Sequence, residues 1–458
     1  MKLVYNVNDK PELGKIVVFA LQQLLAILAA TIAVPSIVGN GMSQSAALFG
    51  AGVGTIVYLL FTKFKSPVFL GSSFAFIGSM FAAFAGGVSM SLGYLGLIIG
   101  AIFAGLVYVV ISIIVKFCGT GWIDKIMPAV VIGPTVAIIG LSLSVNAIGD
   151  LLQGAEYAGK LNYSDTATFT MNTKAYVALI SGLVTLGATI LASIFGKKMV
   201  KTIPFIIGIA AGYITATIFT LIGLAADNTS LQLISWAGFK NMKWVPDFAF
   251  IEAFKGDYKF GEYGNLLTYI GTIAVAYVPV AFVVFAEHIA DHKNLSSIIE
   301  KDLLKEPGLN NTLLGDGVGS IAGAFFGGCP NTTYGESIGC VAISGNASVV
   351  TILATAIIAI VASFFAPFVT FLATIPSCVM GGVCVALYGF IAVSGLKMIQ
   401  KVDLEDNRNL FTVSVILIAG VGGMVLQIGK VKLTAVACAL ILGILTNLLG
   451  KTIKNKTE

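Results

Sequence analysis

Long apolar segments follow one another along almost the whole chain, separated by short polar stretches. Counting them predicts about fourteen membrane crossings, because a helix needs about 20 apolar residues to span a bilayer. The predicted crossings are residues 13–33, 44–62, 67–85, 91–115, 123–147, 175–195, 203–225, 265–290, 311–327, 330–345, 347–373, 376–398, 409–427 and 433–449. This pattern is typical of an all-α polytopic membrane protein.

The composition supports this interpretation. Of the 458 residues, 57% are hydrophobic and 11% are charged, whereas a soluble domain has about 25% charged residues. Most of the 27 lysines and arginines fall in loops on the side of the N-terminus, which predicts cytoplasmic termini in the inner (plasma) membrane. The net charge of +5 does not indicate nucleic-acid binding, because the lysines gather at the ends of crossings, where anionic lipid attracts them.

Two of the predicted crossings are interrupted. The tenth opens with Pro330-Asn-Thr-Thr-Tyr334 and Gly335, and the third opens with Pro67 and is broken near Gly71. Proline lacks a backbone donor, and Asn-Thr-Thr-Tyr favours extended backbone. We therefore expect a short strand in the tenth crossing, followed by a half-helix that begins near Gly335. Such backbone is tolerated at membrane depth only where protein buries it or where it lines a cavity.

The interrupted crossings lie seven crossings apart, which suggests an internal repeat. A second pair with the same separation shares the pattern Pro-x-x-Val-x-Gly, at Pro128–Gly133 and Pro376–Gly381. Because seven is odd, the two halves of the chain must be inverted relative to each other. Breaks at matching places in inverted halves mark the substrate site of transporters. The alternative is coincidence in a membrane sequence rich in proline and glycine.

Four carboxylic acids fall inside predicted crossings: Glu287, Asp291, Asp316 and Glu336. Each costs about 2.5–3.5 kcal/mol or more at the bilayer centre and needs a compensating role. Glu287 and Glu336 are the candidate ligands for substrate or proton, since they come from corresponding parts of the predicted site. For Glu287 the alternative is a carboxylate that is only hydrogen-bonded between helices.

Asp291 lies one helical turn after Glu287. Two carboxyl groups in a dry site resist joint ionisation, so one would hold a proton, which makes Asp291 and Glu287 candidates for proton coupling. The alternative is that Asp291 faces cytoplasmic water and pairs with Lys293. Asp316 is expected to hydrogen-bond the backbone of crossing eight or ten, with substrate contact as the alternative. His288 and His292 should point elsewhere, as structural or interfacial residues.

Uncharged polar and aromatic residues complete the candidate site. Gln22 and Gln23 are expected to hydrogen-bond between helices and to support the site. Phe74, just after the break in the third crossing, could stack on a planar ligand or simply pack. The ligand suited to two carboxylates and an aromatic ring is a flat neutral molecule with ring N–H donors. An anion is disfavoured, because no lysine or arginine falls in the candidate site.

Enzyme chemistry has little support in the sequence. The six cysteines show no metal-ligand spacing, and we find no nucleophile–base pattern or nucleotide-binding loop. We therefore expect a protein that is not an enzyme and that uses no metal and no cofactor.

Several motifs resemble those of the nucleobase–ascorbate transporter family, and within it the bacterial uracil permeases, over nearly the whole chain. The motifs are Leu21-Gln-Gln23, Ala30-Thr-Ile-Ala-Val-Pro35, Gly71-Ser-Ser-Phe-Ala-Phe-Ile77, Ala286-Glu-His-Ile289, Lys301-Asp-Leu-Leu-Lys-Glu-Pro-Gly308 and Pro330-Asn-Thr-Thr-Tyr-Gly-Glu-Ser-Ile-Gly339. The resemblance implies an inverted repeat of seven plus seven crossings, with crossings three and ten paired as short antiparallel strands. It also implies a core domain at 1–120 and 265–373 and a gate domain at 121–264 and 374–458.

The same resemblance implies roles for individual residues. Glu287 and Glu336 would accept hydrogen bonds from ring N–H groups, and backbone amides at Phe74 and Gly335 would donate to ring carbonyls. Ala30, Phe74 and Tyr334 would shape the pocket. The residues expected to support it are Gln22, Gln23, Ser73 and Asp316. Two departures concern coupling: the family often has histidine where this chain has Gln23 and Asp291.

The expected function is import of uracil by proton symport, with the core moving against the gate in a homodimer. One alternative is a purine (xanthine or guanine) or another pyrimidine as substrate. Another is coupling to sodium, because an added carboxylate suits a hard cation. An alternative of another class is a passive nucleobase channel.

Overall fold

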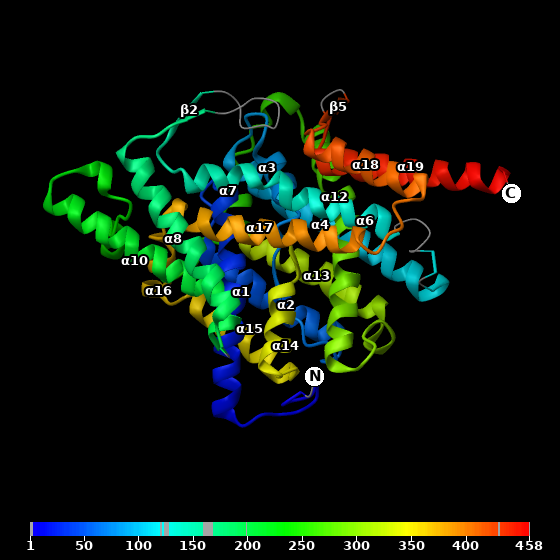
Figure 1. Ribbon diagram of the computed structural model, residues 1–458, viewed down its shortest axis with the longest axis horizontal. Coiled ribbons are helices and arrows are strands. Elements are labelled where there is room, and N and C mark those ends of the chain that lie inside the picture. The colour runs from blue at the N-terminus through cyan, green and yellow to red at the C-terminus, as the bar shows by residue number, and fades with distance from the viewer. Residues whose placement is uncertain are drawn as a thin grey trace.

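The computed structural model of the chain describes residues 3–119, 121–122, 128–158, 168–197, 199–428 and 431–457. Within these ranges the chain is mainly helical, with a few short strands (Figure 1). The start of the predicted fifth crossing, 123–127, and the predicted domain-boundary residue 120 lie outside the described residues.

The first half of the chain forms seven segments in the order expected. They are α1 (Leu13–Val38), α2 (Gln44–Phe61), strand β1 (Leu70–Ser72) with α3 (Ile77–Phe84), α4 (Met90–Cys118), α6 (Ala129–Ser142) with α7 (Ser144–Leu151), α8 (Thr173–Phe195) and α10 (Pro204–Ala225). Smaller elements of this half are the hairpin β2 (Glu156–Ala158) with β3 (Thr168–Thr170), helix α9 (Met199–Thr202), and, in the polar segment that follows α10, η1 (Thr229–Leu231), η2 (Ala237–Lys240), α11 (Ala249–Ala253) and η3 (Gly261–Tyr263).

The second half repeats this order of segments. They are α12 (Leu266–Ile299), α13 (Leu309–Gly327), strand β4 (Asn331–Thr333) with α14 (Gly335–Ser344), α15 (Val349–Ser363) with α16 (Ala366–Ala373), α17 (Ser377–Ile399), α18 (Asn407–Val421) and α19 (Ala435–Thr457). A short turn of π-helix, η4 (Leu304–Gly308), precedes α13, and the hairpin β5 (Leu426–Ile428) with β6 (Val431–Leu433) precedes α19.

The inverted repeat is visible in this order. In each half the third segment is a short strand followed by a half-length helix, and β1 pairs with β4 in antiparallel orientation. Two equivalent strands related by an inversion of the halves must meet in this way. The predicted fold class, including strands that break crossings three and ten, is confirmed.

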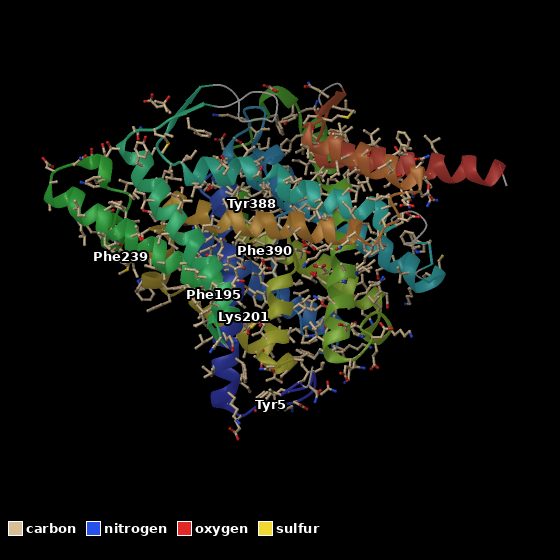
Figure 2. All side chains as sticks on the ribbon, viewed as in Figure 1. Tyr5, Phe195, Lys201, Phe239, Tyr388 and Phe390 are labelled. Atoms are coloured by element: carbon tan, nitrogen blue, oxygen red, sulfur yellow. The ribbon has the colours of Figure 1, made fainter. Side chains whose placement is uncertain are left out.

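Length and hydropathy agree with a membrane protein. Among the described residues, eight helices are long and apolar enough to cross a bilayer, or nine if α15 and α16 count as one bent span. Large apolar side chains are exposed on several helices, such as Phe195 of α8 and Phe390 of α17 (Figure 2), which are 73% and 56% exposed. In water such a surface would be unfavourable, whereas lipid tails solvate it.

Several predicted crossings differ from the structure, for example in the first and last helices, where α1 ends at Val38 rather than 33 and α19 at Thr457 rather than 449. Helix α12 continues to Ile299 rather than ending at 290, because His292 and Leu295 bury one face of its last turns. The eleventh segment bends by 81° between α15 and α16, since Pro367 at the start of α16 cannot continue a helix. Helix α18 ends at Val421 rather than near 427, where Gly423 adopts a φ of +67°.

A close crossing of two helices fixes the position of the strands. A Cβ added to Gly54 of α2 would lie 2.7 Å from the carbonyl oxygen of Gly319 in α13, so the glycines allow backbone contact. Asn331 at the start of β4 fits into this crossing and donates from Nδ2 to the Gly50 carbonyl at 3.1 Å. The strand is therefore anchored to α2 by a tertiary contact between residues 281 positions apart in the sequence.

The helices pack as two groups. Helices α1, α2, α4, α12, α13 and α15 contact one another, and so do α6, α7, α8, α10, α17, α18 and α19. Contacts between the groups include those of α12 with α6 and α19, and of α1 with α10 and α17. Strands β1 and β4 belong to the first group, and they lie where the two groups meet.

Candidate functional site

The paired strands form one wall of the site. Leu70, Gly71 and Ser72 pair with Thr333, Thr332 and Asn331, respectively. The ring of Tyr334 crosses β1 and its hydroxyl donates to the Ser72 carbonyl at 2.8 Å. A Cβ at Gly71 would lie 2.3 Å from this ring, so the break near Gly71 is the place where a side chain must be absent.

The strands lead directly into helix starts. Helix α14 begins at Gly335, as predicted, with Tyr334 as its N-cap residue and Glu336 in its first turn. A carboxylate in the first turn of a helix lies close to the free backbone N–H groups and the positive end of the helix dipole. This end of α14 therefore presents both hydrogen-bond donors and an acceptor to the same space.

A cavity of about 50 Å³ lies in front of these elements. Both Glu287 of α12 and Glu336 of α14 line it, so the structure brings together the two acids that come from different halves of the repeat. The other residues that line it are Phe74, Ala75, Val136, Ile139, Thr332, Thr333, Tyr334, Gly335, Leu387 and Ile391. None of these residues is basic, so the lining does not favour an anion.

The opposite wall was not predicted from the sequence. It consists of apolar side chains from the other helix group, Val136 and Ile139 of α6 and Leu387 and Ile391 of α17. Next to Leu387 on α17, the ring of Tyr388 meets Phe74 edge to face, with centroids 5.8 Å apart. These residues are apolar and do not stand out from the rest of their helices in the sequence, so only the packing of the helices shows that they line the cavity. The cavity thus lies between the two groups of helices.

The remaining predicted ligand lies outside this cavity. Ala30 is buried in α1 with 1% exposure, and it is not among the residues that line the cavity. Helix α1, to which Ala30 belongs, packs on β1.

Asp291 is held by β4. Its Oδ2 accepts a hydrogen bond from Thr333 Oγ1 at 2.7 Å. Lys293, the alternative partner considered above, is exposed, and among the described residues it forms no ion pair with Asp291. Asp291 therefore faces the strand on the same side of α12 as Glu287.

Several polar residues tie the site to its neighbours. Gln23 donates from Nε2 to Ser337 Oγ at 2.5 Å and to the Ser337 carbonyl at 3.2 Å, which links α1 to α14. Gln22 is buried beside it at 5% exposure. Ser73 is also buried, and its backbone N–H donates to the Pro330 carbonyl at 2.8 Å. The predicted hydrogen bond between helices is thus confirmed for Gln23.

The partner expected for Asp316 is corrected by the structure. Asp316 Oδ2 lies 2.7 Å from Nδ1 of the His288 side chain, rather than bonding to the backbone of segment eight or ten. His288 follows Glu287 by one residue, so it leaves α12 on a different face and reaches α13. Asp316 is fully buried there and does not line the cavity.

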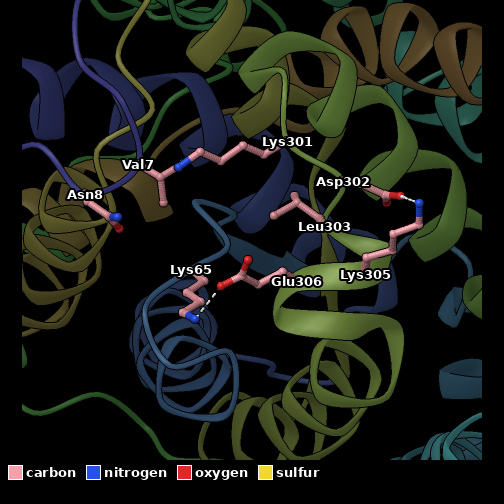
Figure 3. Close-up of a pocket in the computed structure, with 8 residues that line it drawn as sticks. All are labelled: Val7, Asn8, Lys65, Lys301, Asp302, Leu303, Lys305 and Glu306. Carbon is pink, nitrogen blue, oxygen red and sulfur yellow. Dashed lines mark hydrogen bonds and ion pairs between the residues drawn. The ribbon is translucent and has the colours of Figure 1, made fainter.

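The described part of the chain also contains larger cavities. One of about 340 Å³ adjoins the site and shares Phe74, Ala75 and Ile139 with it, and it extends to Asn146 of α7 and Thr434. Another of about 350 Å³ is lined by the N-terminal segment and the loop after α12 (Figure 3). In the second, Lys65 and Glu306 form an exposed ion pair at 2.6 Å, and Lys65 lowers the pKa of Glu306 from its ordinary value. Its ionised lining is unsuited to an uncharged ring.

Comparison with known proteins identifies relatives along nearly the whole chain. The sequence profile of the Permease family matches residues 14–429. Uracil permeases of Bacillus caldolyticus and Bacillus subtilis (strain 168) are each 38% identical over 452 residues, which cover 98% of this chain and 95% of theirs. The uracil permease of Escherichia coli (strain K12) is 34% identical over 450 residues, or 98% of this chain and 94% of that protein.

Solved structures resemble the fold at low sequence identity. The transmembrane domain of the cyanobacterial bicarbonate transporter BicA superposes with a TM-score of 0.63 at 15% identity, covering 97% of this chain and 99% of that one. SLC26A9 gives a TM-score of 0.63 at 11% identity, covering 97% of this chain and 66% of that one. The long sequence match, together with this fold, shows that the chain belongs to the Permease family and is a multi-pass membrane transport protein.

Proposed function

We propose that this protein imports uracil together with protons. The observation that carries the proposal is the meeting of Glu287 and Glu336, from opposite halves of the chain, at one cavity. Uracil has two ring N–H donors and two carbonyl acceptors, and carboxylates are strong acceptors for such donors. The relatives named uracil permeases, at 33–38% identity over nearly the full length, support the same substrate.

The start of each half-helix and α12 would each bind a part of the ring. Glu287 and Glu336 would accept the ring N–H groups, and the backbone N–H groups at Phe74 and Gly335 would donate to the carbonyl oxygens. The side chains of Phe74 and Tyr334 would enclose the ring faces and edge, with Ala30 shaping the pocket from behind β1. Hydrogen bonds to every polar edge make such a site reject analogues that leave a buried group unpaired.

Transport requires the walls of the cavity to separate. A cavity of about 50 Å³ holds only a few water molecules, so a six-membered ring needs more space. We propose that residues 1–120 and 265–373 form a core that carries the acids, and that 121–264 and 374–458 form a gate. Movement of the core along the apolar wall of α6 and α17 would widen the site and expose it to each side in turn.

Proton coupling is assigned to the acids on α12. Glu287 and Asp291 lie one turn apart in a dry region, so ionisation of one disfavours ionisation of the other. Binding of a ring N–H to Glu287 favours its ionised form, and the proton would pass to the neighbouring carboxyl. Sodium is the alternative coupling ion, because carboxylates suit a hard cation.

Replacing Asp291 by Asn is expected to uncouple uptake from pH. The amide still accepts the Thr333 hydroxyl bond but cannot take up a proton, so uptake should no longer rise as the external pH falls. The affinity for uracil should stay within about threefold of the wild type, a change of less than 1 kcal/mol. Initial uptake rates between pH 5 and 8 would be compared with those of Lys293→Gln, which removes the exposed charge two residues away. An unchanged pH dependence in Asp291→Asn would contradict this assignment.

The proposal is tested by uptake of labelled uracil into proteoliposomes with proton and sodium gradients imposed separately. Accumulation driven by an inward proton gradient, and abolished by a protonophore, is expected. Accumulation only with a sodium gradient would show that sodium is the coupling ion. Equilibration without accumulation would indicate a passive channel. Competition by xanthine, guanine and thymine separates uracil from the alternative substrates. Measurement of the mass of the purified protein tests whether it is a homodimer. Protease access in cells tests whether both termini are cytoplasmic.

A further inference from the structure

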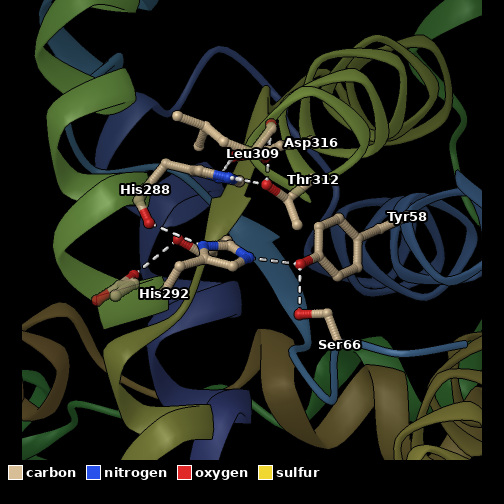
Figure 4. A network of polar contacts seen from close by, with 9 residues as sticks. Tyr58, Ser66, His288, His292, Leu309, Thr312 and Asp316 are labelled. Carbon is tan, nitrogen blue, oxygen red and sulfur yellow. Dashed lines mark hydrogen bonds and ion pairs between the residues drawn. The ribbon is translucent and has the colours of Figure 1, made fainter. Parts of the chain in front are cut away.

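The protein contains two histidines, and both lie on α12 immediately after the acids of the site. His288 follows Glu287 and His292 follows Asp291, and both imidazole rings are fully buried. The two rings stack with centroids 4.0 Å apart and an interplanar angle of 28°. Successive residues of a helix are rotated by about 100°, so the histidines leave α12 on a different face from the acids. His288 reaches Asp316 of α13 and His292 reaches Tyr58 of α2 (Figure 4). Asp291 instead bonds to Thr333 of β4.

The bonds of His288 determine where its protons lie. Thr312 Oγ1 donates to the Leu309 carbonyl at 3.1 Å, so toward His288 it acts as an acceptor. His288 Nε2 at 3.0 Å must therefore carry a proton. The other ring nitrogen, Nδ1, lies 2.7 Å from Asp316 Oδ2. Two unprotonated atoms would repel at this distance, so the pair shares one further proton and is neutral overall.

His292 makes two buried polar contacts. Its Nδ1 lies 2.8 Å from the His288 carbonyl oxygen, which can only accept, so Nδ1 carries a proton. Its Nε2 lies 2.6 Å from the hydroxyl of Tyr58 in α2, and the same hydroxyl donates to Ser66 Oγ at 2.7 Å. The two histidines thus connect α12 to α13 and α2 by buried polar contacts.

We infer that the His288–Asp316 pair, assisted by the His292–Tyr58 bond, is a positioning unit that sets the rotation of α12 and so directs Glu287 and Asp291 toward β4. Helix α12 is apolar around most of its circumference, so packing alone defines its rotation weakly. The bonds to α13 and α2 favour one rotation of α12 about its axis. Helices α13 and α2 are themselves held together by the glycine crossing that anchors β4. Asp316 acts through His288 and has no contact with the substrate. This inference rests on the proposed function only in naming uracil as the ligand whose binding reports the direction of the acids.

Two substitutions at Asp316 separate positioning from charge. In Asp316→Asn the side-chain amide can still donate to His288 Nδ1, whereas Asp316→Leu keeps the branched shape of the side chain and loses the bond. We expect Asp316→Asn to bind uracil within about threefold of the wild type, with an unchanged pH profile of uptake. We expect Asp316→Leu to raise the Kd of the folded protein by about tenfold or more. Thr312→Val removes the acceptor for His288 Nε2 and should cause a smaller increase in the same direction.

A readout that needs no substrate accompanies the binding measurement. An apolar carbodiimide modifies protonated carboxyl groups at membrane depth, and mass spectrometry of the digested protein reports modification of Glu287 and Asp291. Both sites should react at the wild-type rate in Asp316→Asn and at a clearly different rate in Asp316→Leu. This result would stand even if the wild-type protein did not bind uracil, and failure of uracil binding alone would count against the proposed function.

Three outcomes would overturn the inference. Equal loss of binding in Asp316→Asn and Asp316→Leu would show that the charge of Asp316, rather than its bond, is required. A flattened pH profile in Asp316→Asn would make Asp316 a coupling group. A lower yield of folded Asp316→Leu with wild-type Kd and wild-type carbodiimide reactivity would show that the pair only stabilises the fold.

Discussion

Replacing Glu287 by Gln is expected to weaken the binding of uracil strongly. The side chain would lose its charge and one of its two acceptor oxygens, and the new NH₂ group can only donate, so it cannot accept from a ring N–H. Loss of a hydrogen bond to a charged group costs about 1.5–3 kcal/mol, which corresponds to roughly a 10- to 150-fold increase in Kd. Equilibrium binding of labelled uracil to purified protein measures this effect directly, without requiring transport.

The matched control for this variant is Glu300→Gln. Glu300 follows the last turn of the same helix and is exposed, so the chemical change is identical but lies away from the cavity. Its Kd should equal that of the wild type. Wild-type affinity in Glu287→Gln would remove Glu287 from the site and with it the main support for the proposed function.

A loss of similar size is expected for Glu336→Gln. Glu336 lies in the first turn of α14, where the helix dipole favours the ionised carboxylate, so the neutral amide loses both this stabilisation and the charged acceptor. The measurement is again the Kd of uracil, now extended to uracils methylated at either ring nitrogen. Each methyl group removes one donor. If the wild type rejects one of these analogues and Glu336→Gln binds it as well as uracil, then Glu336 accepts from the ring N–H that is methylated in that analogue.

The control for Glu336→Gln is Glu262→Gln, which changes an exposed residue of the polar segment before α12. If both ring-methylated uracils are rejected to the same extent by Glu336→Gln and by the wild type, Glu336 does not contact a ring N–H. Together with Glu287→Gln, this comparison assigns one carboxylate to each ring edge or excludes one of them.

The interruption of two crossings shows which features of the fold could be predicted from neighbouring residues in the sequence. Pro330 and the residues that follow it cannot continue a helix, so a strand and a helix start near Gly335 were predictable, and β4 and α14 have these limits. The antiparallel pairing of β4 with β1 followed from the resemblance to a known family. The sequence contained no sign that Asn331 would anchor the strand between glycines of α2 and α13, because that contact joins residues 281 positions apart.

The crossings with incorrect limits show where local reasoning stops. The apolar run that ends at 290 suggested the end of a helix, yet α12 continues to Ile299 because tertiary contacts bury His292 and Leu295. Likewise, Asp316 was expected to bond to backbone, whereas it bonds to His288. In both cases the residue type predicted that a partner was needed, and the neighbouring helices determined which one.

The sequence by itself determined that this is a membrane protein with an inverted repeat and four intramembrane acids, because charge at membrane depth and breaks in apolar helices are visible residue by residue. Only the tertiary structure decided that Glu287 and Glu336 line one cavity, that Asp291 bonds to Thr333, and that α6 and α17 supply the opposite wall. The physical reason is that a helix apolar on nearly all sides carries no periodic signal for its rotation. Packing and a few buried hydrogen bonds set that rotation.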